Sequence, residues 1–433
     1  MHHVILGAGP AGVIAAETLR KHAPDDRITL VGEEREAPYS RMAIPYLLMG
    51  NIGEEGTLLR KGARHYSELR IDAVRARATR VDVKARQITL DDDAGATLAY
   101  DTLLIATGST PARAPIPGMD LPGVHNCWTL ADARAIMAGA AQGARVLQMG
   151  AGFIGCIILE ALAARGVQLT VVEMGDRMVP RMMGPAAGGM IRQWVESKGV
   201  AVFTGTRVEA IAPGAGQTLD VKLSNGQTLN VDLVISATGV KPTIGFLQDS
   251  GIKCLQGVLT DEHMQTNVPG VYAAGDCAEA FDKVSGTTMV SAIQPNAAEQ
   301  ARVAALNMAQ QHKAGRRAAL RGVTQINVLD TLGLISASFG NWQGVRGGEH
   351  AELTDAAHWR HLSLQFKDDV LVGCNSVGWT EHVGVMRGLV EGQVRLGEWK
   401  DRLLADPTQL MPAYLATAQA QGAWSGAVDE RRR

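Results

Sequence analysis

Apolar and glycine-rich segments follow one another in the same order at two places in the chain. Residues 4–6 form a short apolar run, and a glycine-rich turn and an apolar helix pattern separate it from a second run at 28–31. The same order returns between the runs at 146–149 and 169–172. Short uninterrupted apolar runs are typical of parallel strands that are buried on both faces. The pattern therefore predicts two separate β–α–β units rather than a stacked array, which needs more copies.

The two glycine-rich turns carry the spacing of a dinucleotide-binding loop. Glycines in this pattern let the backbone approach a pyrophosphate, and the following helix offers its free N–H groups to the phosphates. A carboxylate at the end of the next strand accepts the ribose hydroxyls, and Glu33 and Glu173 stand at those two positions. The alternative is a glycine turn that serves tight packing alone. The turns are Gly7-Ala8-Gly9-Pro10-Ala11-Gly12 and Gly150-Ala151-Gly152-Phe153-Ile154-Gly155.

The remaining segments predict how the chain is divided. Residues 111–122 are too rich in proline for a helix or a central strand and predict a hinge. A strand at 271–274, which ends in Gly275-Asp276, and a helix at 294–311 are expected to return to the first domain. Strand patterns then precede helix patterns around 383–390 and 396–404, which is typical of an α+β domain. The expected division is a first domain of residues 1–112 and 243–320, a second of 113–242, a third of 321–420 and a polar tail of 421–433.

Composition narrows the class of protein. The chain has 433 residues, which exceeds one ordinary core, and its net charge of −2 leaves no basic footprint for nucleic acid. No apolar run is long enough to span a bilayer, and the start of the chain leaves no room for a signal peptide, so we expect a cytoplasmic protein. The five cysteines are scattered without metal-ligand spacing, so neither a metal site nor an iron–sulfur cluster is expected within this chain.

Five motifs in fixed order give the chain a family resemblance over nearly its whole length. Besides the two glycine turns, these are Ala106-Thr107-Gly108, Ala237-Thr238-Gly239 and Ala273-Ala274-Gly275-Asp276. In this order they resemble the FAD-dependent pyridine nucleotide-disulfide oxidoreductases. The resemblance implies two Rossmann-like α/β domains, of which the first binds FAD and the second NAD(H), together with the C-terminal α+β domain. Because a carboxylate repels a 2′-phosphate, Glu173 favours NAD(H), while Arg177 nearby leaves some use of NADP(H) open.

The resemblance also assigns individual residues. Asp276 would hydrogen-bond the flavin ribityl chain, although an aspartate after glycine also suits a helix N-cap. The helix after Gln294 would point its N-terminus at the flavin, and Arg41 would lie near the FAD pyrophosphate, unless it is an ordinary surface arginine. The expected FAD residues are Gly7, Gly9, Pro10, Ala11, Gly12, Glu33, Arg41, Thr107, Gly108, Gly275, Asp276, Pro295 and Asn296. The expected NAD residues are Gly150, Gly152, Phe153, Ile154, Gly155, Glu173 and Gly239.

The sequence departs from the family at two kinds of position. Met42 stands where thiol-using relatives carry their redox cysteine, and a thioether cannot form a thiolate. Tyr46 and Ile157 stand where ferredoxin reductases of the family carry a lysine and a glutamate. Losing both members of an ion pair together leaves no unpaired buried charge. Because position 42 holds a methionine, a thiol relay at this position is excluded.

These observations predict hydride transfer between nicotinamide and flavin, without protein acid–base groups. The leading expectation is an NAD(H)-linked reductase that exchanges electrons with an iron–sulfur or rubredoxin-type protein. The alternatives are a stand-alone NADH oxidase and a non-enzymatic redox-sensing flavoprotein. Overall similarity also suggests the NAD-reducing FAD subunit of a multi-subunit complex, such as a tungsten-dependent aldehyde oxidoreductase. The third domain would then form a docking surface, or alternatively a homodimer interface.

Overall fold

The computed structural model describes residues 1–91, 95–311, 315–323 and 326–419. The predicted tail of residues 421–433 lies outside this part of the chain. Contacts divide the chain into two compact units. The first unit consists of Met1–Ala112, Trp128–Leu130 and Val240–Val323, and the second consists of Arg113–Cys127, Ala131–Gly239 and the chain after Val323.

The first unit is built on a parallel sheet with the strand order β19-β7-β1-β2-β3. Its central strands are almost entirely buried, which explains why they read as apolar runs rather than as alternating patterns. The strand that precedes Gly275 pairs with β7 in this sheet, so the late segment of the chain completes the early one. The strands are β1 (His2–Leu6), β2 (Arg27–Gly32), β3 (Ile71–Arg75), β7 (Thr102–Ile105) and β19 (Val271–Ala273).

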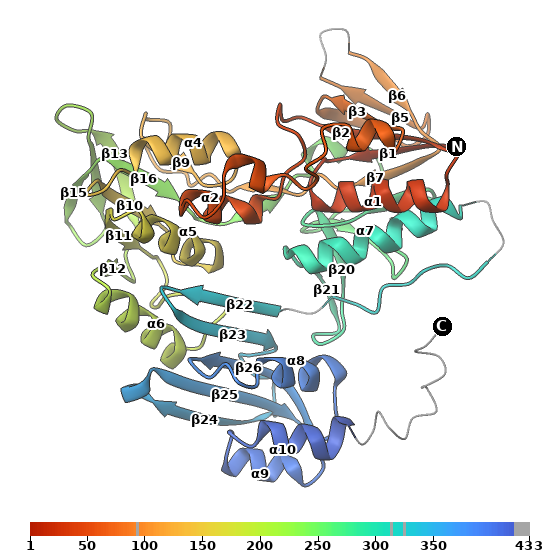
Figure 1. The fold of residues 1–433 in the computed structure, drawn as a ribbon. Coiled ribbons are helices and arrows are strands. Elements are labelled where there is room, and N and C mark those ends of the chain that lie inside the picture. The colour runs from red at the N-terminus through yellow and green to blue at the C-terminus, as the bar shows by residue number, and fades with distance from the viewer. Residues whose placement is uncertain (92–94, 312–314, 324–325, 420–433) are drawn as a thin grey trace. The chain divides into compact units, whose positions relative to one another are not determined.

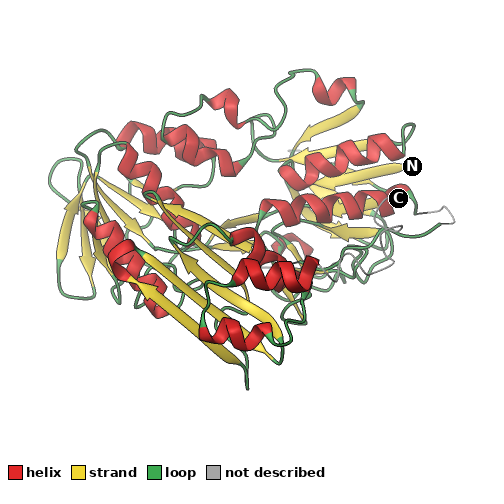
Figure 2. Cartoon of the chain, turned by 60° about the horizontal axis from the view of Figure 1, so that its bottom comes forward, coloured by secondary structure: helices red, strands yellow, loops and turns green. Residues whose placement is uncertain are grey.

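Two helices of the first unit, α1 (Pro10–His22) and α7 (Gln294–Ala309), pack against each other and beside the sheet. Figures 1 and 2 show them lying side by side. Buried alanines such as Ala15, Ala16 and Ala301 let the two backbones approach closely. Each helix has a proline in its first turn, where the missing N–H costs nothing. The proline therefore favours the start of each helix at this position.

The other elements of the first unit are short. A three-stranded antiparallel sheet follows β3, and strands β8 and β17 pair where the chain passes between the units. The elements are β4 (Ala78–Asp82), β5 (Gln87–Leu90), β6 (Thr97–Ala99), β8 (Ser109–Pro111), β17 (Val240–Pro242), β18 (Val258–Leu259), β20 (Ala278–Asp282), β21 (Thr287–Val290), α2 (Ile44–Leu48), α3 (His65–Glu68) and the 3-10 turns Arg41–Ala43, Glu54–Thr57 and Gly245–Leu247.

The second unit repeats the same plan with the parallel order β12-β11-β10-β16-β9. Here too the strand that carries the glycine turn lies between the strand after its helix and a later strand of the chain. The elements are β9 (Val124–Asn126), α4 (Leu130–Gly139), β10 (Arg145–Met149), α5 (Phe153–Ala164), β11 (Gln168–Val172), α6 (Pro185–Ser197), β12 (Ala201–Phe203), β13 (Val208–Pro213), β14 (Leu219–Leu223), β15 (Thr228–Val231) and β16 (Leu233–Ser236).

The second unit also contains a C-terminal antiparallel sheet with the order β22-β23-β26-β25-β24 (Figure 1). Asn375 ties this sheet to the dinucleotide module, because its amide accepts the Gly184 N–H at 2.8 Å and donates to the Met182 carbonyl at 3.0 Å. The indole of Trp194 donates to the Thr331 carbonyl at 3.1 Å. The elements are β22 (Ile326–Thr331), β23 (Leu334–Gly340), β24 (Glu349–Asp355), β25 (Arg360–Lys367), β26 (Val370–Val377), α8 (Val383–Gly392), α9 (Trp399–Ala405), α10 (Leu410–Tyr414), the 3-10 turn Ala356–His358 and the π-helical segment Leu415–Gln419.

The fold class expected from the sequence is confirmed: two Rossmann-like modules and a C-terminal α+β part. The predicted helix at 294–311 forms as α7, whereas the helix expected from residue 396 begins only at Trp399, because Gly397 has a positive φ of 55°. Strand β24, a charged strand at the sheet edge, was not predicted from the sequence. Charged side chains suit an edge but hide the apolar alternation of a strand.

Gly12 and Gly9 should respond differently to a methyl group. A Cβ at Gly12 would lie 1.8 Å from the Gly7 carbonyl oxygen, whereas a Cβ at Gly9 meets nothing within 4 Å. We expect Gly12→Ala to lower the free energy of unfolding by about 2–4 kcal/mol and Gly9→Ala by less than about 1 kcal/mol. Urea denaturation of the two variants, followed by circular dichroism, measures the difference. Equal destabilisation would contradict the close approach described here.

Candidate functional site

The first glycine turn is held tightly against the end of a neighbouring strand. Gly7 has a φ of 112°, and a methyl group on it would lie 2.0 Å from the carbonyl oxygen of Ala106. Gly12 approaches the Gly7 carbonyl, while Gly9 faces open space at the start of α1. Pro10 is the first residue of that helix. The open side of the turn therefore presents helix N–H groups and no side chain, which fits a pyrophosphate.

The second turn repeats this geometry in the second unit. Gly150 has a φ of 96°, and a methyl group on it would lie 2.5 Å from the carbonyl oxygen of Ala237. Gly152 faces open space at the start of α5, and Phe153 and Ile154 form the first turn of that helix. Gly239, which follows β16, also faces open space and has a φ of 106°. Each alanine–threonine–glycine motif thus supplies the carbonyl that its glycine turn rests on.

The two carboxylates at the strand ends differ in their surroundings. Glu33 follows β2 and is exposed, so its oxygens are accessible to a ribose. Glu173 follows β11 and accepts the N–H groups of Ala151 and Gly175, each at 2.7 Å. Glu173 therefore bridges the glycine turn and the loop after β11. Arg177, the residue that left NADP(H) open, pairs with Asp176 at 2.7 Å and donates to the Met183 carbonyl at 2.8 Å.

Asp276 is a half-buried carboxylate beside the first turn. Burial raises the pKa of its carboxyl, while the hydroxyl of Ser109, which donates to it at 3.0 Å, and the nearby charge of Arg41 lower that pKa in part. The cost of removing this carboxylate from water is thus only partly offset. The carboxylate can accept a further hydrogen bond, and a hydroxyl of the ribityl chain provides one. Nearby, Thr107 donates to the Thr243 carbonyl at 2.7 Å, and Gly108 has a φ of 66°.

Gln300 of α7 supports the same region, although the sequence analysis did not single it out. Its side-chain oxygen accepts the Gly275 N–H at 2.8 Å, and Gly275 lies against Ala11 of α1. The amide nitrogen of Gln300 is buried and has no hydrogen-bond partner within the described chain. An orphaned buried donor beside the first turn fits a cofactor with many acceptor oxygens. In the sequence, its role was indicated by the presence of a polar residue on an alanine-rich face of the helix.

Arg41 lies in a polar cluster at the edge of the first unit. Its guanidinium pairs with Glu34 at 2.7 Å, donates to the Trp128 carbonyl at 2.7 Å and lies 5.2 Å from the Trp128 ring centre. The Tyr39 hydroxyl donates to Glu34 at 2.5 Å, and burial raises the pKa of this phenol. Arg41 is thus oriented rather than a freely moving surface side chain. Nothing in the sequence pattern pointed to Trp128.

The start of α7 carries the remaining expected FAD residues. Pro295 lies in the first turn, and Asn296 is buried and donates to the Ser291 hydroxyl at 2.7 Å. The Ser40 hydroxyl donates to the side chain of Gln294 at 3.1 Å, which links this helix start to the segment 40–48. Met42 and Tyr46 belong to that segment and are 51% and 54% exposed, unusual for large apolar side chains. The N-terminus of a 16-residue helix favours negative charge.

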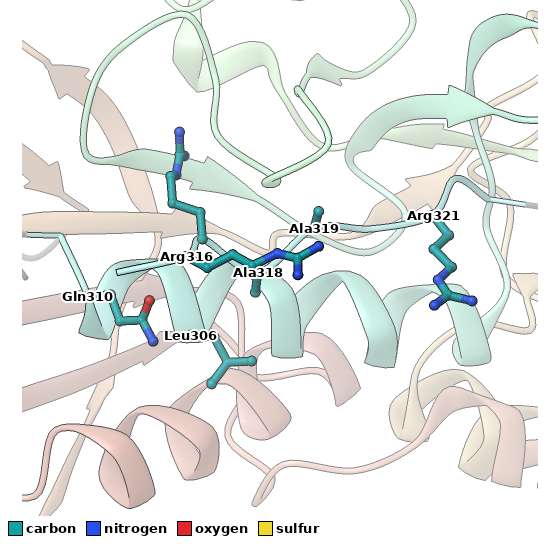
Figure 3. Close-up of a pocket in the computed structure, with 7 residues that line it drawn as sticks. Leu306, Gln310, Arg316, Ala318, Ala319 and Arg321 are labelled. Carbon is teal, nitrogen blue, oxygen red and sulfur yellow. The ribbon is translucent and has the colours of Figure 1, made fainter. Parts of the chain in front are cut away.

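A cavity of about 510 Å³ lies elsewhere, along the C-terminal half of α7 (Figure 3). Its lining includes Leu306 of the helix, Gln310 directly after the helix, and the exposed side chains of Arg316, Arg317 and Arg321. Arginines near a helix C-terminus complement the negative end of its dipole. This cavity is separated from the glycine turn by the length of α7 and is not the dinucleotide site.

Across residues 1–91, 95–311, 315–323 and 326–419, no cluster of three or more histidine, cysteine or acidic side chains is placed to hold a metal. Within the same residues, no helix combines the length and apolar character needed to cross a membrane.

Comparison with known proteins places this architecture in one family. A family model described as "Pyridine nucleotide-disulphide oxidoreductase" matches residues 1–307. The chain belongs to this family. It is an oxidoreductase that uses FAD and NAD(H), the two cofactors expected from its glycine turns and their resemblance.

Individual members resemble the chain over much of its length. It is 32% identical over 406 residues to the NADH-dependent phenylglyoxylate dehydrogenase subunit epsilon of Aromatoleum evansii, covering 94% of this chain and 95% of that protein. It is 33% identical over 316 residues to an NADH oxidase of Methanocaldococcus jannaschii, covering 71% and 70%. The structure of the ferredoxin reductase for the CYP199A2 system of Rhodopseudomonas palustris matches with 26% identity and a TM-score of 0.76, covering 87% and 91%.

Asp276→Asn should separate cofactor binding from the stability of the apoprotein in this oxidoreductase. The raised pKa means that the folded chain holds this proton more tightly than the unfolded chain. Its stabilising contribution is therefore present below the ordinary aspartate pKa and is lost as pH rises through the raised value. We expect the asparagine variant to retain FAD roughly ten- to a hundredfold less tightly. Above that pH window its apoprotein should be at least as stable as wild type.

Flavin fluorescence on dilution gives the affinity. Urea titration of the apoproteins between about pH 4 and 8, a range that begins near the ordinary aspartate pKa and extends above it, gives the stability. Unchanged FAD affinity in the variant would refute the role of Asp276.

Glu173→Ala should erode the preference for NADH. The variant loses a carboxylate that repels a 2′-phosphate and accepts ribose hydroxyls, so kcat/KM for NADH should fall roughly ten- to a hundredfold while that for NADPH changes little. Steady-state kinetics with both nucleotides measure the ratio. Glu33→Ala, at the matching position of the first unit, serves as the control and should leave the ratio alone. A ratio unchanged in Glu173→Ala would refute this assignment.

Proposed function

We propose that this flavoenzyme is an NAD(H)-linked reductase that exchanges electrons with an iron–sulfur or rubredoxin-type protein, as a component of a larger redox system. The observation that carries the proposal is the state of the five cysteines. Cys127, Cys156, Cys277 and Cys374 are buried, and Cys254 is half-buried. Burial raises the pKa of all five thiols, for Cys127 and Cys156 to about 12.

A thiol relay needs an accessible thiolate, and a thiol with a raised pKa remains protonated at neutral pH. Position 42, where a redox cysteine would stand, holds a methionine. Electrons that reach the flavin therefore have no cysteine to pass through in this chain. They leave to, or arrive from, an acceptor or donor outside it.

In this proposal each glycine turn holds the pyrophosphate of its dinucleotide through helix N–H groups. Glu33 and Glu173 accept the ribose hydroxyls, Asp276 orients the ribityl chain and Arg41 complements the FAD phosphates. Bound FAD supplies the chemistry, accepting or donating a hydride at the nicotinamide and passing electrons singly to a partner. The N-terminus of α7, with Pro295 and Asn296, stabilises negative charge near the flavin. No protein side chain transfers a proton in this scheme.

Similarity to a ferredoxin reductase and to a dehydrogenase subunit supports the partner class. The match to the dehydrogenase subunit extends through the C-terminal sheet, which favours a subunit of a multi-subunit oxidoreductase. In that setting electrons would flow from iron–sulfur clusters through the flavin to NAD. The narrower expectation of a tungsten-dependent aldehyde oxidoreductase, and the cytoplasmic location, stay predictions. So do the domain boundaries and the homodimer alternative.

A stand-alone NADH oxidase is the second candidate, because one relative of similar identity carries that name. An oxidase would deliver electrons from the flavin directly to oxygen. The third reading, a non-enzymatic sensor, has no observation in its favour in a chain that is an oxidoreductase.

The cysteine-free protein, with all five cysteines replaced by alanine, tests the proposal. We expect NADH to bleach its flavin anaerobically at a rate within about threefold of wild type, because no thiol lies on the electron path. With a ferredoxin added, both proteins should reduce it under NADH, and a dithionite-reduced ferredoxin should yield NADH from NAD⁺. Stopped-flow absorbance measures each step.

Oxygen consumption without a carrier separates the two candidates. Rapid oxygen turnover by a protein that ignores ferredoxin and rubredoxin, and that elutes alone after co-expression with neighbouring redox genes, would establish the oxidase and refute the reductase. Loss of flavin bleaching in the cysteine-free protein, with FAD still bound, would show that a cysteine is needed on the electron path and would contradict the proposal.

A further inference from the structure

We propose that Gln148 is a positioning residue for NAD(H): its buried amide sets the shape of the second glycine turn. This inference rests on the assignment of that turn to NAD(H) and not on the identity of the electron partner. Gln148 is the last residue but one of the central strand β10 and is 0% exposed. It is the polar side chain in an otherwise apolar run, Val146-Leu147-Gln148-Met149.

The Gln148 amide nitrogen bridges the two ends of the turn. It donates to the carbonyl oxygen of Gly150 at 2.9 Å and to that of Gly155 at 2.9 Å. These are the first and third glycines of the motif, one at the end of β10 and one in the first turn of α5. One side chain therefore fixes the distance between the strand end and the helix start.

Contacts from other segments hold the rest of the turn. The Ala151 N–H donates to Glu173 at 2.7 Å, and the Ala151 carbonyl accepts the Val179 N–H at 2.8 Å. The Gly150 N–H donates to the Val172 carbonyl at 2.8 Å. With the Gly150 and Gly155 carbonyls drawn to Gln148, the unpaired N–H groups at the start of α5 are left to face a pyrophosphate.

The first turn provides a comparison within the same molecule. Ile5 occupies the matching position two residues before Gly7 and is also fully buried. There the third glycine approaches the first directly, and a methyl group on Gly12 would lie 1.8 Å from the Gly7 oxygen. In the second turn the matching value is 2.5 Å, and the Gln148 nitrogen lies 3.2 Å from the same methyl position on Gly155. The second turn is more open, and the amide spans it.

Stability alone does not explain a glutamine at this position. The Gln148 side-chain oxygen is buried and has no hydrogen-bond partner within the described chain, which is unfavourable for folding. An apolar residue serves the first turn at the matching place. The unpaired oxygen therefore offsets part of what the two donated hydrogen bonds contribute to stability, and the shape of the turn is the property that affects nucleotide binding.

The variant Gln148→Met tests this role, because methionine keeps the length of the side chain and removes both donors. We expect the KM for NADH and the dissociation constant for ADP-ribose to rise about tenfold, with kcat within about twofold of wild type. FAD content should be unchanged, and the melting temperature should change little, because removal of the unsatisfied oxygen offsets the loss of the two hydrogen bonds. Leu147→Met, a buried substitution in the same strand, is the matched control and should change none of these values.

Each other outcome overturns the proposal. Unchanged NADH and ADP-ribose binding in folded Gln148→Met would show that the amide does not shape the site. A variant that fails to fold, melts lower or loses FAD in parallel would make Gln148 a general stabiliser of the fold. These results are independent of the partner, because reduction of ferredoxin under NADH by the wild-type protein reports the proposed function separately.

Discussion

The close approach of a glycine to a carbonyl oxygen is the contact on which both nucleotide modules depend. Gly7 lies against Ala106 and Gly150 against Ala237, at distances that leave no room for a side chain. Each alanine directly follows the neighbouring parallel strand, so the contact brings two strand ends and a helix N-terminus together. Free N–H groups and the positive end of a helix dipole therefore lie together at this point.

The polar groups around this point are held by local hydrogen bonds rather than left to the solvent. Glu173 bridges two backbone N–H groups, and Asp276 accepts a hydroxyl while remaining only partly compensated. Gln300 and Gln148 attach amides to backbone groups next to the turns. Low dielectric strengthens each of these bonds and penalises each unsatisfied atom. The unsatisfied amide nitrogen of Gln300 and the unsatisfied amide oxygen of Gln148 thus lie next to the two turns, where a bound dinucleotide is expected.

The burial of the cysteines explains why thiol chemistry is not expected in this chain. Four of the five pack as small hydrophobes in the interior, where the neutral thiol is favoured over the thiolate. In a family whose name includes disulfide chemistry, this chain retains the dinucleotide modules and holds methionine at position 42. A chain can thus keep the fold and the cofactors of the family without the cysteine through which other members pass electrons on from the flavin.

The sequence by itself determined the two modules, because buried parallel strands and glycine turns leave local signatures: apolar runs, fixed glycine spacing and a carboxylate after the next strand. It also determined the helix at Gln294 and most C-terminal strands, since their periodicity is strong. It did not reveal β24, whose charges mask its alternation, nor Ser109, Trp128, Gln300 and Gln148 as parts of the sites. Only the tertiary structure brought Ser109 to Asp276 and Gln300 to Gly275, because these pairs are distant in sequence. A hydrogen bond depends on where strands and helices meet in space, and no local pattern encodes that position.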